Sequence, residues 1–140
     1  MRKTARIVIL GIAGIILGMQ LFRPVRDNPP VRADIIAPPA VKALLRPACY
    51  DCHSNETRWP WYSHVNPAGW LLAGHVRDGR DALNFSDWDT LDVRKRYLLK
   101  RDILSSVEEE SMPLPSYLLL HPDARLDSED RAVIERWVTE

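Results

Sequence analysis

The sequence predicts an all-α fold, and three observations carry this prediction. Apolar residues recur at helical spacing in several segments, and residues suited to capping a helix precede those segments. No stretch alternates apolar and polar residues for long enough to predict a convincing strand. The chain has 140 residues and no internal repeat, so its length suits about one domain. We therefore expect one helical domain with a short appendage.

The chain begins with an apolar segment. Residues 7–22 contain no charge, and five basic residues flank them: Arg2, Lys3, Arg6, Arg23 and Arg26. This pattern predicts a membrane anchor or signal segment over residues 1–23, in the form of an N-terminal transmembrane helix. More basic residues precede the segment than follow it, so the N-terminus is expected to stay cytoplasmic. The predicted protein crosses the inner (cytoplasmic) membrane once and holds its C-terminal domain in the periplasm or outside.

Two other interpretations of this segment remain open. Signal cleavage after Val31-Arg32-Ala33 would give a soluble periplasmic protein, although this site lies far downstream and prolines precede it. The segment could also be a buried core helix.

The remaining chain divides by composition. Residues 24–38 are rich in proline, which removes backbone donors and favours an extended chain, so we predict a spacer that lifts the domain off the membrane. Residues 39–140 hold the helical signals and form the predicted domain.

Two helices are predicted in the first half of the domain. One covers residues 40–46 and is expected to stop at Pro47. The next covers residues 67–79, with Asn66 as the N-cap and Pro67 at the first helical position.

Two more helices are predicted in the second half. The first begins at Asp89 or Thr90 and ends at about Glu110. Its apolar stripe, interrupted by Lys100, consists of Val93, Tyr97, Leu104 and Val107. The last helix is capped by Asp127 or Ser128. Its apolar face consists of Val133, Ile134, Trp137 and Val138.

The charge distribution excludes one class of partner. The formal net charge is zero, from 19 basic and 19 acidic residues. Five of the basic residues and none of the acidic ones lie within residues 1–26, so the rest carries 14 basic against 19 acidic residues, a net charge of −5. An acidic body offers no basic surface for phosphates, so we expect no nucleic-acid partner.

One motif carries chemistry. The sequence Cys49-Tyr50-Asp51-Cys52-His53 has the C-x-x-C-H pattern of c-type haem attachment. In this pattern the two thiols form thioethers with one porphyrin, and the histidine becomes the proximal iron ligand. A thioredoxin-like dithiol would need a βαβ context, and half of a zinc site would need a second ligand pair. A simple disulfide is the third alternative. The motif therefore predicts a single covalent haem c with its iron, and residues 39–140 as a c-type cytochrome domain.

Around this motif the chain resembles the haem-binding-domain family of small exported bacterial proteins, related in layout to class I cytochromes c. The residues that carry the resemblance are 49–63 (CYDCHSNETRWPWYS), Pro67, His75-Val76, Gly79-Arg80, Leu83-Asn84-Phe85-Ser86, 110–117 (ESMPLPSY) and His121-Pro122-Asp123-Ala124. The resemblance covers nearly the whole predicted domain. It implies a small cytochrome c-like helical domain around one covalent haem, and it leaves the physiological role open.

The sequence indicates the second axial ligand of the iron less directly than it indicates His53. Met112 is the only methionine beyond residue 19, and Pro113 and Pro115 stiffen its backbone, so we predict it as the distal iron ligand. His75 is the runner-up, although its helical face predicts a buried, hydrogen-bonded structural histidine. His64 and His121 precede turn residues and are expected at the surface or tethering loops. Core packing is the alternative role for Met112.

Other residues have weaker functional interpretations. The aromatic side chains expected to wall the haem, or else to be ordinary core, are Trp59, Trp61, Trp70 and Tyr62. The acidic run at residues 108–110 is either a solvated helix end or a docking surface for a basic partner protein.

Together these features predict a membrane-tethered, single-haem c-type cytochrome that transfers single electrons between redox partner proteins in the periplasm. We do not expect it to transform a substrate. The alternatives are a haem-based sensor or small-ligand binder with a displaceable distal ligand, a peroxidase-like enzyme, and a thiol oxidoreductase with free Cys49 and Cys52.

Overall fold

A computed structural model describes residues 2–140. Within this range the chain forms seven α-helices, three short 3-10 helices and no β-strand, which confirms the all-α class. The longer helices are α1 (Arg2–Met19), α2 (Pro39–Ala48), α4 (Ala68–Ala82), α5 (Val93–Glu108) and α7 (Ser128–Thr139). The shorter ones are α3 (Tyr50–His53), α6 (Pro115–Leu118), η1 (Trp61–His64), η2 (Trp88–Thr90) and η3 (Pro122–Ala124).

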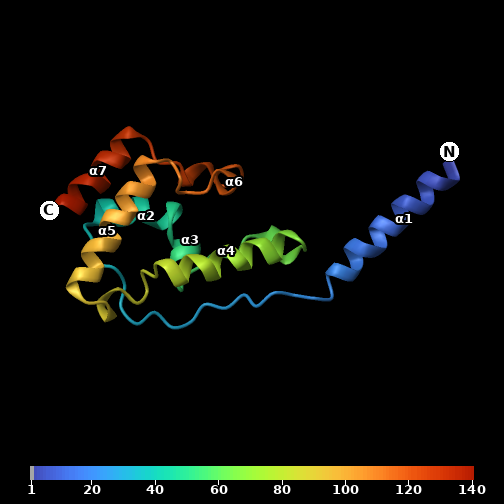
Figure 1. Ribbon diagram of the computed structural model, residues 1–140, viewed down its shortest axis with the longest axis horizontal. Helices are drawn as coiled ribbons and strands as arrows, with labels where there is room; N and C mark the ends of the chain where they lie inside the picture. The colour runs from blue at the N-terminus through green and yellow to red at the C-terminus, as the bar shows by residue number, and fades with distance from the viewer. Residues whose placement is uncertain (1) are drawn as a thin grey trace.

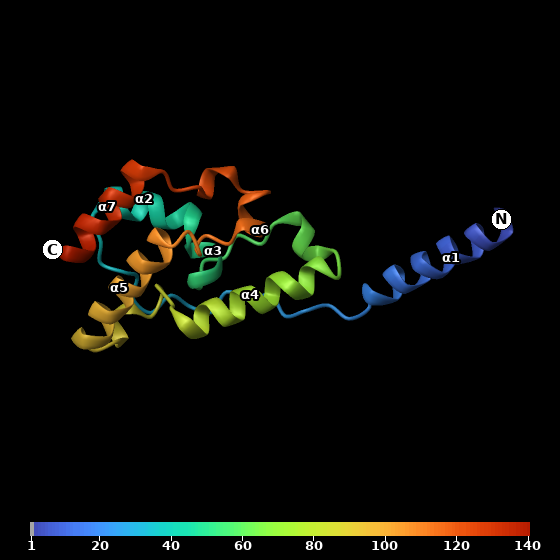
Figure 2. The same cartoon turned by 45° about the horizontal axis from the view of Figure 1, so that its top comes forward.

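The helices after α1 gather around one core. Figures 1 and 2 show α2, α5 and α7 together at one end of the molecule, α3 between α2 and α4, and α1 projecting away from the rest. The core draws on α2, α5 and α7, on the segment before α2 and on the loop between α4 and α5. Its most deeply buried apolar side chains are Ile35, Val41, Leu45, Phe85 and Ile134. Burial of these side chains is the main favourable contribution to folding.

The predicted transmembrane helix is corrected by the structure. Helix α1 carries basic residues in its first turns and ends at Met19, so its uncharged part covers only residues 7–19. Thirteen helical residues span about 20 Å, whereas the hydrocarbon core of a bilayer is about 30 Å thick. Among residues 2–140, no helix combines the length and apolar character that a membrane crossing requires. The predicted single-pass membrane localisation is therefore wrong.

The end of α1 is held by the start of α4. The Gln20 side-chain nitrogen donates to the Asn66 backbone carbonyl at 3.0 Å, and the Gln20 side-chain oxygen accepts from the Asn66 backbone N–H at 2.9 Å. The Asn66 side chain in turn donates to the carbonyls of Met19 and Phe22. Asn66 is 3 % exposed, so this junction is buried although α1 beyond it is not.

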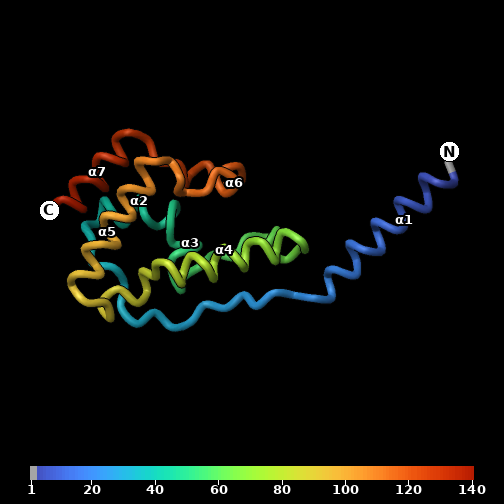
Figure 3. Tube along the Cα trace, in the orientation of Figure 1, coloured from blue at the N-terminus to red at the C-terminus, as the bar shows by residue number. Residues whose placement is uncertain are grey.

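Residues 20–34, which we call the strap, lie along the domain (Figure 3). The strap was predicted, over most of its length, as part of a spacer, but it is hydrogen-bonded to the domain at several points. Arg26 donates to the Ser63 carbonyl at 2.6 Å, and Asn28 donates to the Thr57 carbonyl at 2.9 Å. At the far end the amides of Arg32 and Ala33 both donate to the Ser86 carbonyl.

The helix boundaries differ from the prediction where tertiary contacts compete with local signals. Helix α2 continues through Pro47 to Ala48, because Leu45 and Ala48 are buried against the core. Asn66 does not cap α4, since its side chain is committed to the end of α1. Pro67 is the N-cap residue instead, and α4 extends to Ala82.

Helix α5 begins later than predicted. Its N-cap is Asp92, whose side chain accepts from the Lys95 amide at 2.8 Å, and residues 88–90 form η2. The predicted stripe is partly wrong, because Val93 and Tyr97 are exposed and α5 packs inward through Ile103 and Val107.

Helix α7 matches its prediction. Asp127 accepts from the amides of Glu129 and Asp130, and the Asp130 side chain accepts from the Asp127 amide, which completes a capping box. Ile134, Trp137 and Val138 are buried against the core, as expected.

Candidate functional site

The three residues of the motif lie on one helical turn at the end of α2 and in α3. The Cys49 carbonyl accepts from the amides of Cys52, at 3.2 Å, and His53, at 2.8 Å. Side chains three and four positions apart on a helix are neighbours, so this turn brings both thiols and the imidazole together. All three side chains are half-buried.

Two adjoining cavities open beside this turn, with volumes of about 220 and 310 Å³. Four residues line both cavities: Ala48, His53, Ala82 and Met112. Cys49 lines the smaller cavity and Cys52 the larger one. We call the two cavities together the crevice, and their volumes suit a small-molecule or cofactor site.

The walls of the crevice are mostly apolar around the Cys49 cavity. Its apolar lining comes from α5 and from the loop after α4, with Leu83, Phe85, Leu99, Ile103 and Val107. The Cys52 cavity carries more polar groups at its edge: Asp51, His75, Asp78 and Tyr117. Asp102 and Ser106 likewise border the Cys49 cavity, so both cavities have mainly apolar walls with polar groups at their edges.

Two backbone carbonyls orient the His53 ring. Its Nδ1 atom lies 2.9 Å from the Gly79 carbonyl oxygen and 3.2 Å from that of Leu83. Carbonyl oxygens only accept hydrogen bonds, so Nδ1 carries the proton and Nε2 keeps its lone pair. Burial lowers the pKa of His53, against the opposing effect of these two hydrogen bonds, and this favours the neutral ring. A neutral imidazole held through its other nitrogen is the usual form of a metal-ligating histidine.

Both thiols are held in the protonated form. Burial, together with the neighbouring Cys52, raises the pKa of Cys49 to about 12. Burial and the nearby Asp51 raise the pKa of Cys52 to about 11, although Arg80 opposes this. Neither cysteine forms a disulfide, and a low thiolate fraction keeps each of them weakly nucleophilic at neutral pH.

Helix α4 packs closely against the cysteine motif at Gly79. A Cβ atom placed at Gly79 would lie 2.6 Å from the carbonyl oxygen of Cys52, which is closer than real Cβ contacts. Glycine at this position therefore allows the Gly79 carbonyl to approach the His53 ring.

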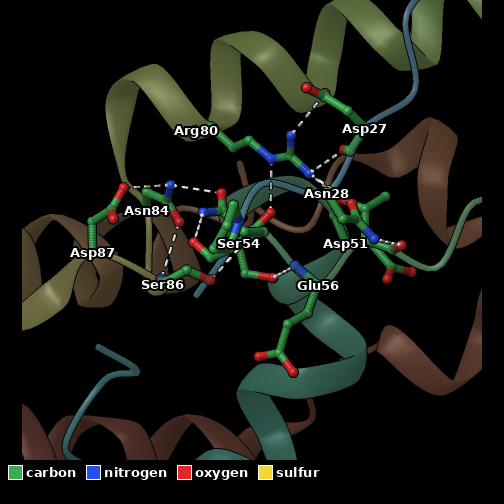
Figure 4. Close-up of polar contacts among 12 residues, drawn as sticks. Asp27, Asn28, Asp51, Ser54, Glu56, Arg80, Asn84, Ser86 and Asp87 are labelled. Atoms are coloured by element: carbon green, nitrogen blue, oxygen red, sulfur yellow. Dashed lines mark hydrogen bonds and ion pairs between the residues drawn. The ribbon is translucent and has the colours of Figure 1, made fainter. Parts of the chain in front are cut away.

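A polar network fixes the chain that follows the motif (Figure 4). The Arg80 guanidinium donates to the Ser54 carbonyl at 2.8 Å and to the Asn28 side chain of the strap at 2.9 Å. The Asn84 side chain accepts from the Ser86 amide and donates to Asp87. The motif is thus clamped to the strap and to the segment after α4.

Sequence reasoning missed the contact between Asp51 and Tyr117. The Tyr117 hydroxyl donates to Asp51 Oδ2 at 2.8 Å, across 66 residues of sequence. Burial and this hydrogen bond raise the pKa of Tyr117, so its hydroxyl remains a donor. No local pattern marks such a long-range pair; the occurrence of both residues in the resemblance segments was the only available signal.

The four candidates for the distal iron ligand lie in different parts of the structure. Met112 lines both cavities with His53, and its side chain is 38 % exposed. His75 lines only the Cys52 cavity and is exposed, so the expectation of a buried structural histidine is wrong. Helix α4 buries Val76 and Gly69 instead, which turns His75 outward. His121 does tether a loop, through Tyr62, and His64 is exposed as expected.

The predicted aromatic walls do not line the crevice. Trp61 is 76 % exposed, and Trp59 and Trp70 border a hollow beside the strap. The aromatic residues that do line the crevice are Phe85 and Tyr117, and α5 supplies aliphatic side chains to the Cys49 cavity.

The acidic run at residues 108–110 is exposed, as both of its interpretations require. Two of its carboxylates have partners within the protein. Glu110 forms an ion pair with Arg131 at 2.8 Å, and Glu109 accepts from the Ser105 hydroxyl at 2.9 Å.

An all-helical domain whose crevice brings an oriented imidazole, a thioether and two thiols together defines a small helical haem protein. The model of the family described as a haem-binding domain matches residues 14–140, and the chain belongs to that family. No curated protein and no solved structure matches the chain.

The residues present fit a haem. The crevice offers mainly apolar walls for a porphyrin, and His53 lines both cavities with its Nδ1 engaged by backbone carbonyls, which leaves Nε2 available as a ligand. Within the part of the chain that the structure describes, no group of three or more His, Cys, Asp or Glu side chains is placed to hold a metal ion.

Proposed function

We propose that this protein is a single-haem c-type cytochrome that carries one electron at a time between partner proteins. The observation that supports this most directly is the division of the crevice lining. Cys49 lines one cavity and Cys52 the other, while His53 and Met112 line both. This is the arrangement expected if one haem is held by two thioethers and two axial ligands.

The two cysteines would hold the cofactor covalently. Cys49 and Cys52 would each hold the haem through one thioether, a linkage that needs no oxidant because the thiol hydrogen is kept in the product. The raised pKa of both thiols keeps the hydrogen on sulfur at neutral pH.

His53 and Met112 would hold the iron of the haem. The carbonyls of Gly79 and Leu83 fix the His53 ring and raise the basicity of Nε2. A methionine thioether is a soft ligand and favours the reduced metal. Bound haem supplies an iron that cycles between the ferric and ferrous states and so accepts and releases single electrons.

The first test concerns covalent attachment. Wild-type protein should retain its haem after denaturation, because thioethers survive the loss of packing. Cys49→Ser with Cys52→Ser should release it completely, and each single variant should retain it through one thioether. Absorption of the unfolded protein after gel filtration in denaturant measures the retained haem. Release from the wild type would contradict covalent attachment.

The second test concerns the distal ligand. Met112→Ala should open the iron, so that the reduced variant binds carbon monoxide and the ferric form shifts toward high spin. Met112→His should restore six-coordination at a lower potential, because imidazole stabilises the ferric state more than a thioether does. His75→Ala is the control. If His75→Ala, and not Met112→Ala, abolishes the low-spin spectrum, the axial pair is His53 and His75.

A second candidate function is a small-ligand sensor with a displaceable distal ligand. The exposure of Met112 favours it, because a side chain that is 38 % exposed is not locked by packing. The two functions differ in the wild type: a carrier resists carbon monoxide when reduced, whereas a sensor binds it readily.

A further inference from the structure

The segment that carries Met112 is fixed at its upstream end by α5. The amides of Ser111 and Met112 both donate to the Ser106 carbonyl at 3.1 Å, and the Ser111 hydroxyl donates to the same oxygen. Pro113, next in the chain, is buried. The backbone at Met112 is thus tied to the C-terminal part of α5.

The same segment is fixed at its downstream end by α3. Tyr117 follows Met112 by five residues, and its hydroxyl donates to Asp51 Oδ2 at 2.8 Å. Asp51 lies between the two cysteines and is only 8 % exposed. This hydrogen bond therefore joins the loop that carries Met112 to the helix that carries His53.

Further contacts hold the Tyr117 ring in place. The His121 ring stacks on it, with centroids 4.0 Å apart and planes 5° apart. His121 Nε2 is also 2.8 Å from the Tyr62 hydroxyl. On the other side, Asp51 accepts from the Arg58 amide at 3.0 Å, so the carboxylate is also held by more than one contact.

We propose that Tyr117 and Asp51 are positioning residues for the distal ligand. Their hydrogen bond sets how closely the Met112 loop approaches the helix of His53, and so holds the thioether over the crevice. Met112 is 38 % exposed, so its own packing does not fix it, and the hydrogen bonds on either side of it hold its position instead. This inference rests on the proposed ligation by Met112.

The test compares two variants of the haem-loaded protein, each of which lacks one tyrosine hydroxyl. Tyr117→Phe removes the hydroxyl and keeps the ring that stacks on His121. Tyr50→Phe is the matched control, because the Tyr50 hydroxyl also donates to a carboxylate, that of Asp34 at 2.6 Å, which lies outside the Met112 segment. Both variants lose one phenol–carboxylate hydrogen bond.

Carbon monoxide competes with Met112 for ferrous iron, so its apparent affinity reports how firmly the thioether is held. Loss of one hydrogen bond to a carboxylate should raise this affinity about tenfold in Tyr117→Phe, and Tyr50→Phe should match the wild type. The long-wavelength absorption band of methionine-ligated ferric haem should weaken only in Tyr117→Phe. In an Asp51→Ala background, Tyr117→Phe should add nothing.

Hydrogen exchange of the loaded protein supplies a readout independent of ligand binding. Amides of residues 112–118 should exchange faster in Tyr117→Phe than in the wild type or in Tyr50→Phe. Unchanged exchange there, unchanged carbon monoxide affinity, or an equal rise in Tyr50→Phe would each overturn the positioning role. If Met112→Ala binds carbon monoxide no better than the wild type, the proposed ligation fails and the positioning role falls with it. If Met112→Ala opens the iron and Tyr117→Phe does not, only the positioning role is lost.

Discussion

Gly79 has a hydrogen atom in place of a Cβ atom, and this allows α4 to approach the cysteine motif closely. An added Cβ would lie 2.6 Å from the Cys52 carbonyl oxygen and 3.2 Å from Cys52 Cβ, so α3 or α4 would have to move. The Gly79 carbonyl also orients His53, so such a movement reaches the axial ligand.

We therefore predict that Gly79→Ala lowers the free energy of unfolding by about 1–3 kcal/mol, as overpacking does. Gly74→Ala on the same helix is the control. A Cβ there meets no atom within 4 Å, and replacing a helical glycine should stabilise by about 0.5–1 kcal/mol. Denaturant titration of both variants measures the difference, and a Gly79→Ala protein as stable as the wild type would contradict the steric argument.

At the residue scale, sequence reasoning reached the parts of the site that are close in sequence. The spacing of Cys49, Cys52 and His53 is one helical turn, so their proximity needs no knowledge of the rest of the fold. Met112 was predicted as a ligand from its prolines and by elimination; it lines both cavities together with His53, and its ligation stays a prediction. Tyr117 was not singled out, because its partner Asp51 is 66 residues away.

At the scale of single helices, α7 is stabilised by its capping box and by the face that carries Ile134 and Trp137. It packs on α5, which lines the crevice through Ile103 and Val107. The stability of α7 therefore supports one wall of the crevice.

Asp127→Ala should cost about 1 kcal/mol of folding free energy, because two amides at the start of α7 lose their acceptor. Asp123→Ala is the control, since Asp123 is exposed and its side chain makes no hydrogen bond within residues 2–140. Thermal unfolding of the loaded proteins compares the two. Equal effects of both substitutions would show that charge, rather than capping, is responsible.

Helix boundaries were predictable where no tertiary contact engaged the residue that could cap the helix. Asp127 is free to cap α7, and the prediction there is confirmed. Asn66 has the right chemistry for a cap, but the end of α1 takes its side chain, so a local rule gave the wrong role. At α5 the two predicted starting residues, Asp89 and Thr90, belong to η2, and the helix is capped by Asp92 instead.

At the scale of the whole molecule, Arg80 joins three parts of the chain. Its side chain is 13 % exposed and donates to Ser54 and Thr57 after the motif and to Asp27 and Asn28 in the strap. The apolar segment and prolines alone predicted a spacer, because composition cannot show which distant side chains a proline-rich chain contacts.

Arg80→Met keeps the aliphatic stem and removes every one of these donors. We expect the free energy of unfolding to fall by about 2–3 kcal/mol and the strap to become sensitive to proteases. Arg77→Met is the control on the same helix, since Arg77 pairs only with its exposed neighbour Asp78 and should change stability by less than about 0.5 kcal/mol. Limited proteolysis followed by mass spectrometry locates the cleavage, and an intact strap in Arg80→Met would contradict the clamp.

The long-range contact between Asp51 and Tyr117 also bears on the order in which the parts of the site form during folding. The turn that holds Cys49, Cys52 and His53 closes over a few residues, whereas the contact that brings the Met112 loop over the crevice must close a loop of 66 residues. Local turns form faster than long loops, because less chain entropy is lost in closing them. We therefore expect the thiols and the imidazole to come together during folding before the Met112 segment reaches the crevice, which would leave an interval in which a cofactor could enter from that side.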